Sequence, residues 1–344
     1  MDLLTEQAPL FTFDTLSYKE KIGRLCELVR PRFRKMLRRY ALFHLIAWIV
    51  LAGEGLSLAT LFFLSPKSHL AAYGLGLILL SLFSYLALRL YLQGRKPDQF
   101  EALRDLYLQS CKGMIHYQEG LADHHLALAG AACKLADGLG FRRLATYPPV
   151  RSLRRPLPFW ERLLFLAYCR ETLQMRTLLL QAAIDEYIKL VRIEPTHLEV
   201  HAALANAYVM LSSLYLDPKK AREMGQEETL PRRAYGEEER AAYRQAAQMA
   251  VEEFKILEAY APNDPWVYTQ LAYCYHDLRE TDKEIAAYER ILELCPDDLE
   301  TLFKLGIRYF QRGETAKGLK VYQQLKGERY SRAESLLAFY GASR

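Results

Sequence analysis

Two runs of apolar residues near the N-terminus constrain the fold of this chain more than any other feature. Residues 41–64 read ALFHLIAWIVLAGEGLSLATLFFL and residues 69–92 read HLAAYGLGLILLSLFSYLALRLYL, and each run holds one formally charged residue. At a rise of about 1.5 Å per residue, either run is long enough as a helix to cross a hydrocarbon core of roughly 30 Å. Together they predict a two-helix transmembrane hairpin over residues 41–92.

Basic residues beside the hairpin predict its orientation. Lys and Arg that flank a span are retained on the cytoplasmic side, whereas short loops with little charge are translocated. Residues 1–40 form a basic segment, basic residues also follow the second run, and the connecting SPKSH holds only Lys67. We therefore expect an integral membrane protein with both termini in the cytoplasm, most simply in a bacterial inner membrane. A cleaved signal peptide is the alternative, but it would begin with a short basic region rather than forty residues rich in charge.

Glu54 is the acid in the middle of the first run. A carboxylate at the centre of a span costs roughly 2.5 to 3.5 kcal/mol on insertion scales and usually marks a polar pathway or a partner. Glu54 could therefore bind a proton or an ion. We favour a neutral carboxylic acid that hydrogen-bonds across the hairpin or to another subunit, because no second acid or base stands beside it to form a relay. Self-association through the hairpin is thus also open.

Beyond residue 97 the pattern is helical almost throughout. Apolar residues recur three and four apart, Pro or Gly interrupts them every twenty residues or so, and no strand-rich segment is evident. We therefore expect an all-α fold, with a helical pair over residues 97–140. A linker over residues 141–159 follows, because four prolines prevent a helix there. Its arginines could contact anionic lipid or an acidic partner, although a solvated hinge is the favoured interpretation.

Two segments thirty-four residues apart repeat one pattern. Leu271-Ala272-x-x-Tyr275 corresponds to Leu305-Gly306-x-x-Tyr309, and the agreement continues into the helices that follow. A period of 34 residues with a helix, a turn and a helix resembles the tetratricopeptide repeat. Less regular copies precede these two, one with a first helix from about residue 160 to 175 and a second from 183 to 195. Two departures from the family pattern are Glu284, where the family usually has alanine, and Tyr330, where it usually has proline.

The resemblance implies an α-solenoid of four helical pairs over residues 160–332. An insertion near residues 212–245 interrupts the second pair, and a capping helix over residues 333–344 closes the stack. The insertion mixes both signs of charge densely, which is typical of an exposed loop. It could also be a docking element, because insertions in repeat arrays fall on one face.

The resemblance further implies a peptide-binding groove lined by the first helices of the repeats. The expected groove is aromatic with few charges and suits an apolar or amphipathic helix from a protein or peptide partner. The clamp by which some relatives hold the carboxylate of chaperone tails is incomplete, so we do not expect that ligand. The expected groove residues are Asn206, Met210, Thr269, Tyr273, His276, Asp277, Phe303, Ile307 and Phe310.

Two groups of residues are candidate metal ligands. Cys274, His276 and Cys295 fall on separate helices of one repeat rather than at zinc-ligand spacing, so packing explains them better. A second group lies at helical spacing on one face and resembles half of a carboxylate-bridged site. A full site needs a second such helix, and none is visible, so a solvated polar face is favoured. This second group consists of His116, Glu119, Asp123 and His124.

The remaining functional classes find little support in the sequence. A net charge of +5 over 344 residues, with no clustered basic face in the helical region, argues against a nucleic-acid partner. No phosphate loop, nucleophile motif or paired-carboxylate arrangement is present. The six cysteines stand far apart without a C-x-x-C pair, which favours reduced thiols on the cytosolic side. We therefore expect no enzyme activity and no cofactor.

The function predicted from these features is that of a membrane-anchored adaptor or scaffold. The hairpin would hold the repeat array at the lipid bilayer, and the groove would recruit a protein or peptide partner to the membrane surface. The alternative is a structural subunit of a membrane protein assembly that acts through the hairpin itself. A remote alternative is a helical metal-dependent enzyme that uses the polar face near His116.

Overall fold

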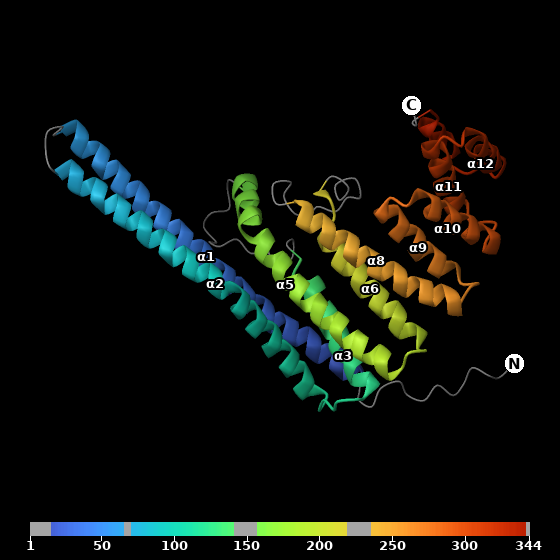
Figure 1. Cartoon of the computed structure of the whole chain (residues 1–344), viewed down its shortest axis with the longest axis horizontal. Helices are drawn as coiled ribbons and strands as arrows, with labels where there is room; N and C mark the ends of the chain where they lie inside the picture. The colour runs from blue at the N-terminus through green and yellow to red at the C-terminus, as the bar shows by residue number, and fades with distance from the viewer. Residues whose placement is uncertain (1–14, 65–69, 141–156, 219–234, 342–344) are drawn as a thin grey trace. The chain divides into compact units, whose positions relative to one another are not determined.

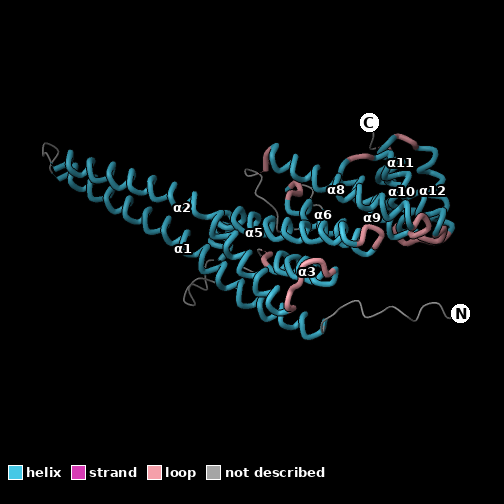
Figure 2. The backbone as a smooth tube through the Cα atoms, turned by 60° about the horizontal axis from the view of Figure 1, so that its bottom comes forward, coloured by secondary structure: helices cyan, strands magenta, loops and turns pink. Residues whose placement is uncertain are grey.

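A computed structural model describes residues 15–64, 70–140, 157–218 and 235–341 of the chain (Figure 1). Every regular element within these ranges is a helix (Figure 2). The all-α prediction is therefore confirmed for the described part. The turn of the hairpin at 65–69, most of the predicted linker, and the centre of the predicted insertion lie outside it. The chain divides into two compact units, Met1–Ala182 and Ala183–Arg344.

The first unit is built around two long helices that lie side by side, α1 (Thr15–Leu64) and α2 (Leu70–Met114) (Figure 1). Both extend well beyond the predicted spans. Helix α2 continues through Pro97, where we expected a new helix to begin, and α1 continues through Pro31. Proline removes one backbone hydrogen bond. Close to both prolines, α1 and α2 pack through aromatic side chains. The ring centroids of Phe33 and Phe100 lie 5.7 Å apart.

The lower half of this hairpin forms a packed core with helix α3 (Ala122–Gly138). Many residues of α3 are alanines, so α1 and α2 approach it closely. Tyrosine hydroxyl groups of α1 and α2 therefore reach backbone carbonyl oxygens of α3. Tyr107 donates its hydroxyl proton to the carbonyl oxygen of Ala131 at 2.9 Å, and Tyr18 donates to that of Ala127 at 3.2 Å. Burial is complete at the centre, where Tyr107 has no exposed surface.

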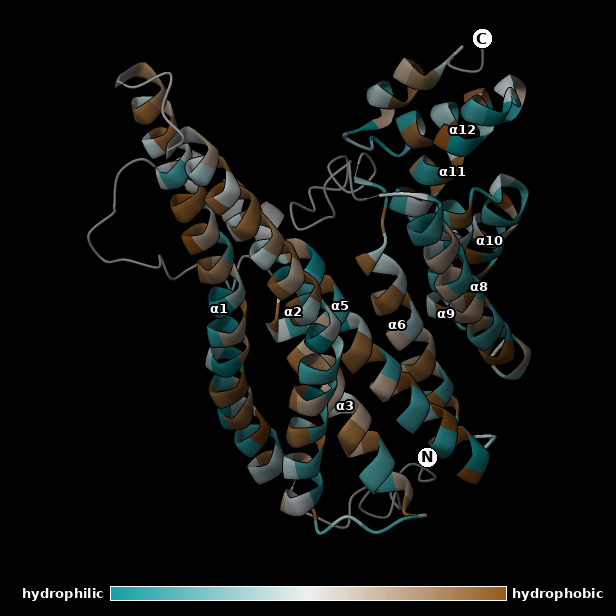
Figure 3. Cartoon of the chain, turned by 60° about the vertical axis from the view of Figure 1, so that its left-hand side comes forward, coloured by the Kyte–Doolittle hydropathy of each residue, from teal (hydrophilic) through white to brown (hydrophobic). Residues whose placement is uncertain are grey.

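Hydrophobic residues predominate in the upper half of the hairpin (Figure 3). Many of their side chains are exposed. Both helices are long and apolar enough to cross a membrane, and no residue in their most apolar stretches is buried. Trp48 is 63% exposed and Phe63 is 85% exposed. The core helix of a soluble protein would bury such residues. Other large exposed side chains are Ile46, Ile49, Leu56, Leu80, Phe83 and Leu90.

Helix α5 (Leu157–Ile193) is a single helix. We expected two helices here, separated by a turn between residues 175 and 183, and that expectation is wrong. Residues 160–193 contain neither proline nor glycine. Nothing in the local sequence therefore stops the helix before Pro195, which ends it.

The second unit stacks three helical pairs: α6 (Leu198–Leu214) with α8 (Glu237–Tyr260), α9 (Pro265–Leu278) with α10 (Thr281–Leu294), and α11 (Leu299–Arg312) with α12 (Thr315–Gly327). Neighbouring pairs pack through α8 against α9 and α10 against α11. The predicted capping helix is a short 3₁₀ helix, η2 (Ala333–Phe339), which contacts both α11 and α12.

Capping residues set the start and end of the regular pairs. Asp264 and Asp298 accept backbone hydrogen bonds at the N-termini of α9 and α11, from Trp266 and Thr301 respectively. Gly313 ends α11 in the left-handed conformation, with φ at 86°. The two first helices therefore begin and end at equivalent positions of the repeat.

Gly306 occupies the closest contact of the last pair. A Cβ atom at this position would lie 2.8 Å from side-chain atoms of Val321 and Leu336, both of which are buried. Helix α11 can approach α12 and η2 this closely only because residue 306 has no side chain.

We expect Gly306→Ala to lower the free energy of unfolding by about 1 to 3 kcal/mol, since inserting a methyl group into a close-packed core forces its neighbours apart. Gly327→Ala is the matched control, because no atom lies within 4 Å of its Cβ position. Urea unfolding of the full-length protein in detergent, followed by circular dichroism, measures both. Equal stability of the two variants would contradict the packing described here.

Candidate functional site

The exposed surface of two neighbouring first helices, α9 and α11, is the candidate binding site. Two contacts join these helices: Lys304 Nζ lies 3.4 Å from the hydroxyl of Tyr273, and Arg308 Nη2 lies 2.6 Å from His276 Nδ1. We call this surface the α9–α11 face. Its exposed or half-exposed residues are Gln270, Tyr273, His276 and Asp277 on α9, and Lys304, Ile307, Arg308 and Gln311 on α11.

A buried carboxylate lies under this face. Glu284 is 2% exposed, and Arg308 Nε donates to its Oε1 at 2.7 Å. The same guanidinium donates to His276 Nδ1, so this nitrogen carries no proton and the neutral imidazole keeps its proton on Nε2. Arg308 also contacts the side-chain oxygen of Gln311. Glu284 stands where the family usually has alanine, and the ion pair with Arg308 compensates its buried charge.

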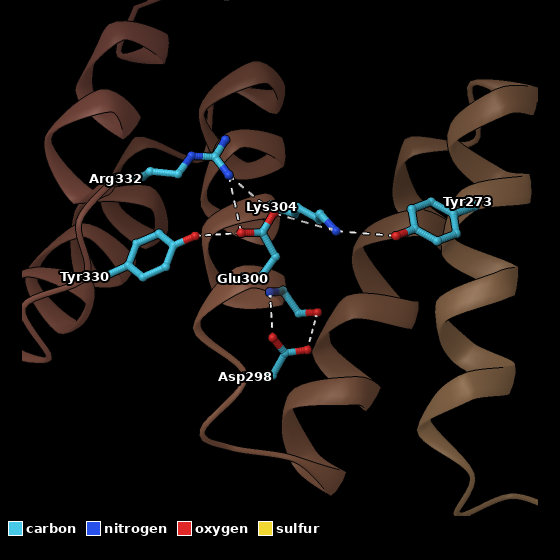
Figure 4. A network of polar contacts seen from close by, with 7 residues as sticks. Tyr273, Asp298, Glu300, Lys304, Tyr330 and Arg332 are labelled. Carbon is cyan, nitrogen blue, oxygen red and sulfur yellow. Dashed lines mark hydrogen bonds and ion pairs between the residues drawn. The ribbon is translucent and has the colours of Figure 1, made fainter. Parts of the chain in front are cut away.

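A second polar network continues the face toward the C-terminus (Figure 4). The hydroxyl of Tyr330 donates to Glu300 Oε2 at 2.6 Å, and Arg332 Nη1 lies 3.3 Å from the same oxygen. Lys304 Nζ lies 3.9 Å from the other oxygen of Glu300. The hydrogen bond to Glu300 raises the pKa of Tyr330, so its hydroxyl remains protonated and acts as a donor.

The network covers an aromatic ring that we expected to line the groove. Phe303 is only 2% exposed and lies under Arg332, whose guanidinium is 4.6 Å from the ring centroid. Phe310 is 1% exposed and packs against Gly318 and Tyr340. The prediction that these two residues line an aromatic groove is therefore wrong. Segments that follow α12 in the chain cover both rings, and the repeat register alone does not specify such segments.

The other expected groove residues differ in accessibility. Tyr273 is 46% exposed, whereas Thr269 donates its hydroxyl proton to Pro265 of its own helix at 2.9 Å. Asp277 lies beside Tyr243 of α8, and burial together with this carboxylate raises the pKa of Tyr243. Ile307 is half-exposed on α11. Asn206 is exposed and Met210 is half-exposed, both on α6.

The structure separates the residues of the candidate metal face near His116. Helix α2 ends at Met114, His116 lies in a turn with φ at 48°, and α3 begins only at Ala122. His124 is buried, and its Nδ1 accepts a hydrogen bond from the backbone of Gln118 at 3.0 Å. The expectation of one helical face is wrong, because the backbone between Met114 and Ala122 is not helical and has a positive φ at both His116 and Gly120.

No group of three or more His, Cys, Asp or Glu side chains within the described ranges is arranged to hold a metal ion. The two cysteines of the α9–α10 pair stand apart from each other. Cys274 is buried, and burial raises the pKa of its thiol to about 12, whereas Cys295 is exposed after α10. Cys274 therefore lacks the environment of a reactive thiolate.

Glu54 makes a hydrogen bond across the hairpin. Ser81 Oγ on α2 donates to Glu54 Oε1 at 2.7 Å. The second oxygen, Oε2, is buried and has no hydrogen-bond partner among the described residues. The neutral state of this carboxyl group stays a prediction.

The comparisons with known proteins identify the repeat. The family model of the tetratricopeptide repeat matches residues 265–308, which include α9, α10 and most of α11. These helices form a tetratricopeptide repeat. No curated protein matches the chain in sequence.

Similar solved structures include MamA residues 41 to the end from Desulfovibrio magneticus RS-1, with 15% identity, coverage of 58% of this chain and 97% of that chain, and a TM-score of 0.31. TTC0263, a thermophilic repeat protein of Thermus thermophilus, has 21% identity, coverage of 64% and 95%, and a TM-score of 0.32. The TPR2AB domain of yeast Sti1, in a complex with pHSP90, has 17% identity, coverage of 70% and 91%, and a TM-score of 0.25.

We expect Arg308→Gln to destabilise the protein by about 3 kcal/mol, because it leaves the buried Glu284 carboxylate without its cation. Glu284→Ala, which introduces the residue usual in the family, should restore most of that loss in the double variant. Urea unfolding of the two single variants and the double variant gives the coupling free energy. Additive effects would show that the pair does not fix α10 to α11.

Proposed function

We propose that this protein is a membrane-anchored scaffold that binds a protein or peptide partner through its α9–α11 face. The single observation that carries the proposal is the combination of two surfaces in one chain. One is a hairpin with exposed apolar side chains, and the other is a tetratricopeptide repeat with an accessible first-helix face. The proposal includes no catalytic step.

The hairpin is proposed to span the membrane. Soluble monomeric proteins rarely expose contiguous apolar surface of this extent, whereas lipid tails solvate it without cost. Basic residues of both helices lie toward the end of the hairpin that packs against α3, and they favour a cytoplasmic location for that end. Both termini would then lie in the cytoplasm, in a bacterial inner membrane.

The chemistry of the α9–α11 face favours a peptide that presents carbonyl or carboxylate oxygens. Lys304 Nζ lies 5.5 Å from the centroid of the Tyr273 ring, so the ammonium group and the ring form one exposed platform. The neutral His276 offers its Nε2 proton, and Gln270 and Gln311 add amide donors. Arg308 is engaged by Glu284 and serves to hold His276 in place. This polar face replaces the apolar groove expected from the repeat register.

A structural subunit acting through the hairpin is the second candidate. The observation that favours it is Glu54 Oε2, which is buried without a hydrogen-bond partner among the described residues. A donor from another chain would satisfy this oxygen once association rearranges the side chains that cover it. An unrelated two-span anchor in place of residues 41–92 should preserve the function of a scaffold and abolish that of such a subunit.

The orientation can be tested with thiols, because Cys295 is the exposed cysteine of the chain's described part. In bacterial spheroplasts that express the protein, a membrane-impermeant maleimide should label Cys295 only after permeabilisation. A Ser68→Cys, Cys295→Ser variant should be labelled in intact spheroplasts, because residue 68 lies in the connection between the spans. Labelling of Cys295 from outside would contradict the proposed topology.

The binding face can be tested by photo-crosslinking in native membranes. A benzoylphenylalanine at position 273 should capture a partner, whereas the same probe at Lys320, exposed on α12, should not. Lys304→Glu should reduce the capture at position 273 by about tenfold, because a like charge opposite the partner's oxygens weakens binding by at least about 1.4 kcal/mol. Equal capture at positions 273 and 320, or capture unaffected by Lys304→Glu, would contradict the assigned face.

A further inference from the structure

We infer that four arginines at the foot of the exposed apolar stretch form a binding collar for anionic phospholipid headgroups. The collar consists of Arg38 and Arg39 on α1 and Arg89 and Arg95 on α2, all of them exposed. The inference rests on the proposed function, since it requires the hairpin to lie in a bilayer. It adds the chemical class of lipid that the protein prefers.

The collar lies where the packed base of the hairpin gives way to exposed apolar surface. Tyr40 marks this level, because its hydroxyl donates to Gln99 at 2.9 Å and Lys96 Nζ lies 4.6 Å from its ring centroid. On the base side, Phe33 and Phe100 have no exposed surface. On the other side, Leu42 and Leu90 are 53% and 69% exposed. The headgroup layer of a bilayer that surrounds the apolar stretch would meet the protein at this level.

Among the described residues, no acid forms an ion pair with the arginines of the collar. Helix α1 has no acid between Glu27 and Glu54, and α2 has none before Asp98. The neighbouring cation Lys96 differs, because it pairs with Glu171 at 2.7 Å and is largely buried.

The surrounding groups also fit a headgroup layer. Arg95 donates to the hydroxyl of Tyr91 at 2.9 Å, so an amphipathic ring lies beside a guanidinium. Tyr85 lies nearby and hydrogen-bonds to His44 at 3.1 Å across the hairpin. Tyrosine is enriched at membrane interfaces, and guanidinium groups form paired hydrogen bonds with phosphate oxygens. Four such cations within one short band of the hairpin select anionic over zwitterionic lipids by charge.

Trp48 provides a reporter for the test, because it is exposed on α1 nine residues beyond Arg39, roughly 13 Å along the helix. The full-length protein with Trp160→Phe and Trp266→Phe keeps only this tryptophan. It is reconstituted in vesicles of equal parts phosphatidylglycerol and phosphatidylcholine. Either the anionic or the zwitterionic lipid carries bromine on its acyl chains, and bromine quenches the fluorescence of Trp48 on contact.

We expect the brominated anionic lipid to quench Trp48 about twofold more strongly than the brominated zwitterionic lipid at low salt, with the difference reduced at high salt. Replacing Arg39, Arg89 and Arg95 by glutamine should remove the difference. The matched control replaces Lys19, Lys21 and Arg24 by glutamine, which removes the same charge from exposed positions far down the base of α1. This control should keep the difference.

The outcomes separate the inference from the function on which it rests. Equal quenching by both lipids would show that the hairpin is inserted but that the collar has no preference, which overturns the inference alone. Loss of the preference in the control variant would show that total charge rather than the collar is responsible, which also overturns it. Absence of quenching by either lipid would overturn membrane insertion and the inference together.

Discussion

The packing of α1 against α2 is the constraint on which the first unit depends. The aromatic contacts at its base, Phe33 with Phe100 and Tyr107 with the backbone of α3, hold the two helices in one register. Because the helices continue without interruption, the same register determines which residues meet farther along. It brings Ser81 to Glu54 and places the exposed arginines within one band of the hairpin, about 9 Å deep because Arg89 and Arg95 are six residues apart. The packed base of the hairpin therefore determines the positions of side chains in the exposed stretch of α1 and α2.

In the second unit, a buried ion pair determines the chemistry of the exposed face. Glu284 is almost fully buried, so its carboxylate requires a cation, and Arg308 of the next repeat supplies it. The guanidinium then fixes the tautomer of His276 on the preceding first helix. Three helices are thus connected beneath a surface of hydrogen-bond donors. A scaffold that recognises a partner by polar groups benefits from such rigidity, because little conformational entropy is lost when the partner binds.

The repeat pattern predicted the helical pairs α9–α10 and α11–α12, but it placed a turn inside α5 and predicted side-chain exposure only in part. Small residues at Ala272 and Gly306 and apolar residues at Leu271 and Leu305 are buried as the 34-residue period requires. Phe303 and Phe310 show the limit of the same reasoning. Their register places them on the first-helix face, but Arg332 and Tyr340, which lie beyond the last repeat, cover them. A periodic pattern cannot specify contacts with segments that do not repeat.

The sequence by itself determined what depends on local composition and spacing. The apolar runs of residues 41–64 and 69–92, the helical periodicity and the N-termini of α9 and α11 follow from residue types and their separation, because rise per residue and capping are local properties. Tertiary structure decided the continuity of helices through Pro31 and Pro97, the pairing of Glu284 with Arg308, and the division of one hairpin into a buried base and an exposed stretch. These features depend on which distant residues pack together, and burial is a property of the neighbours as much as of the residue itself.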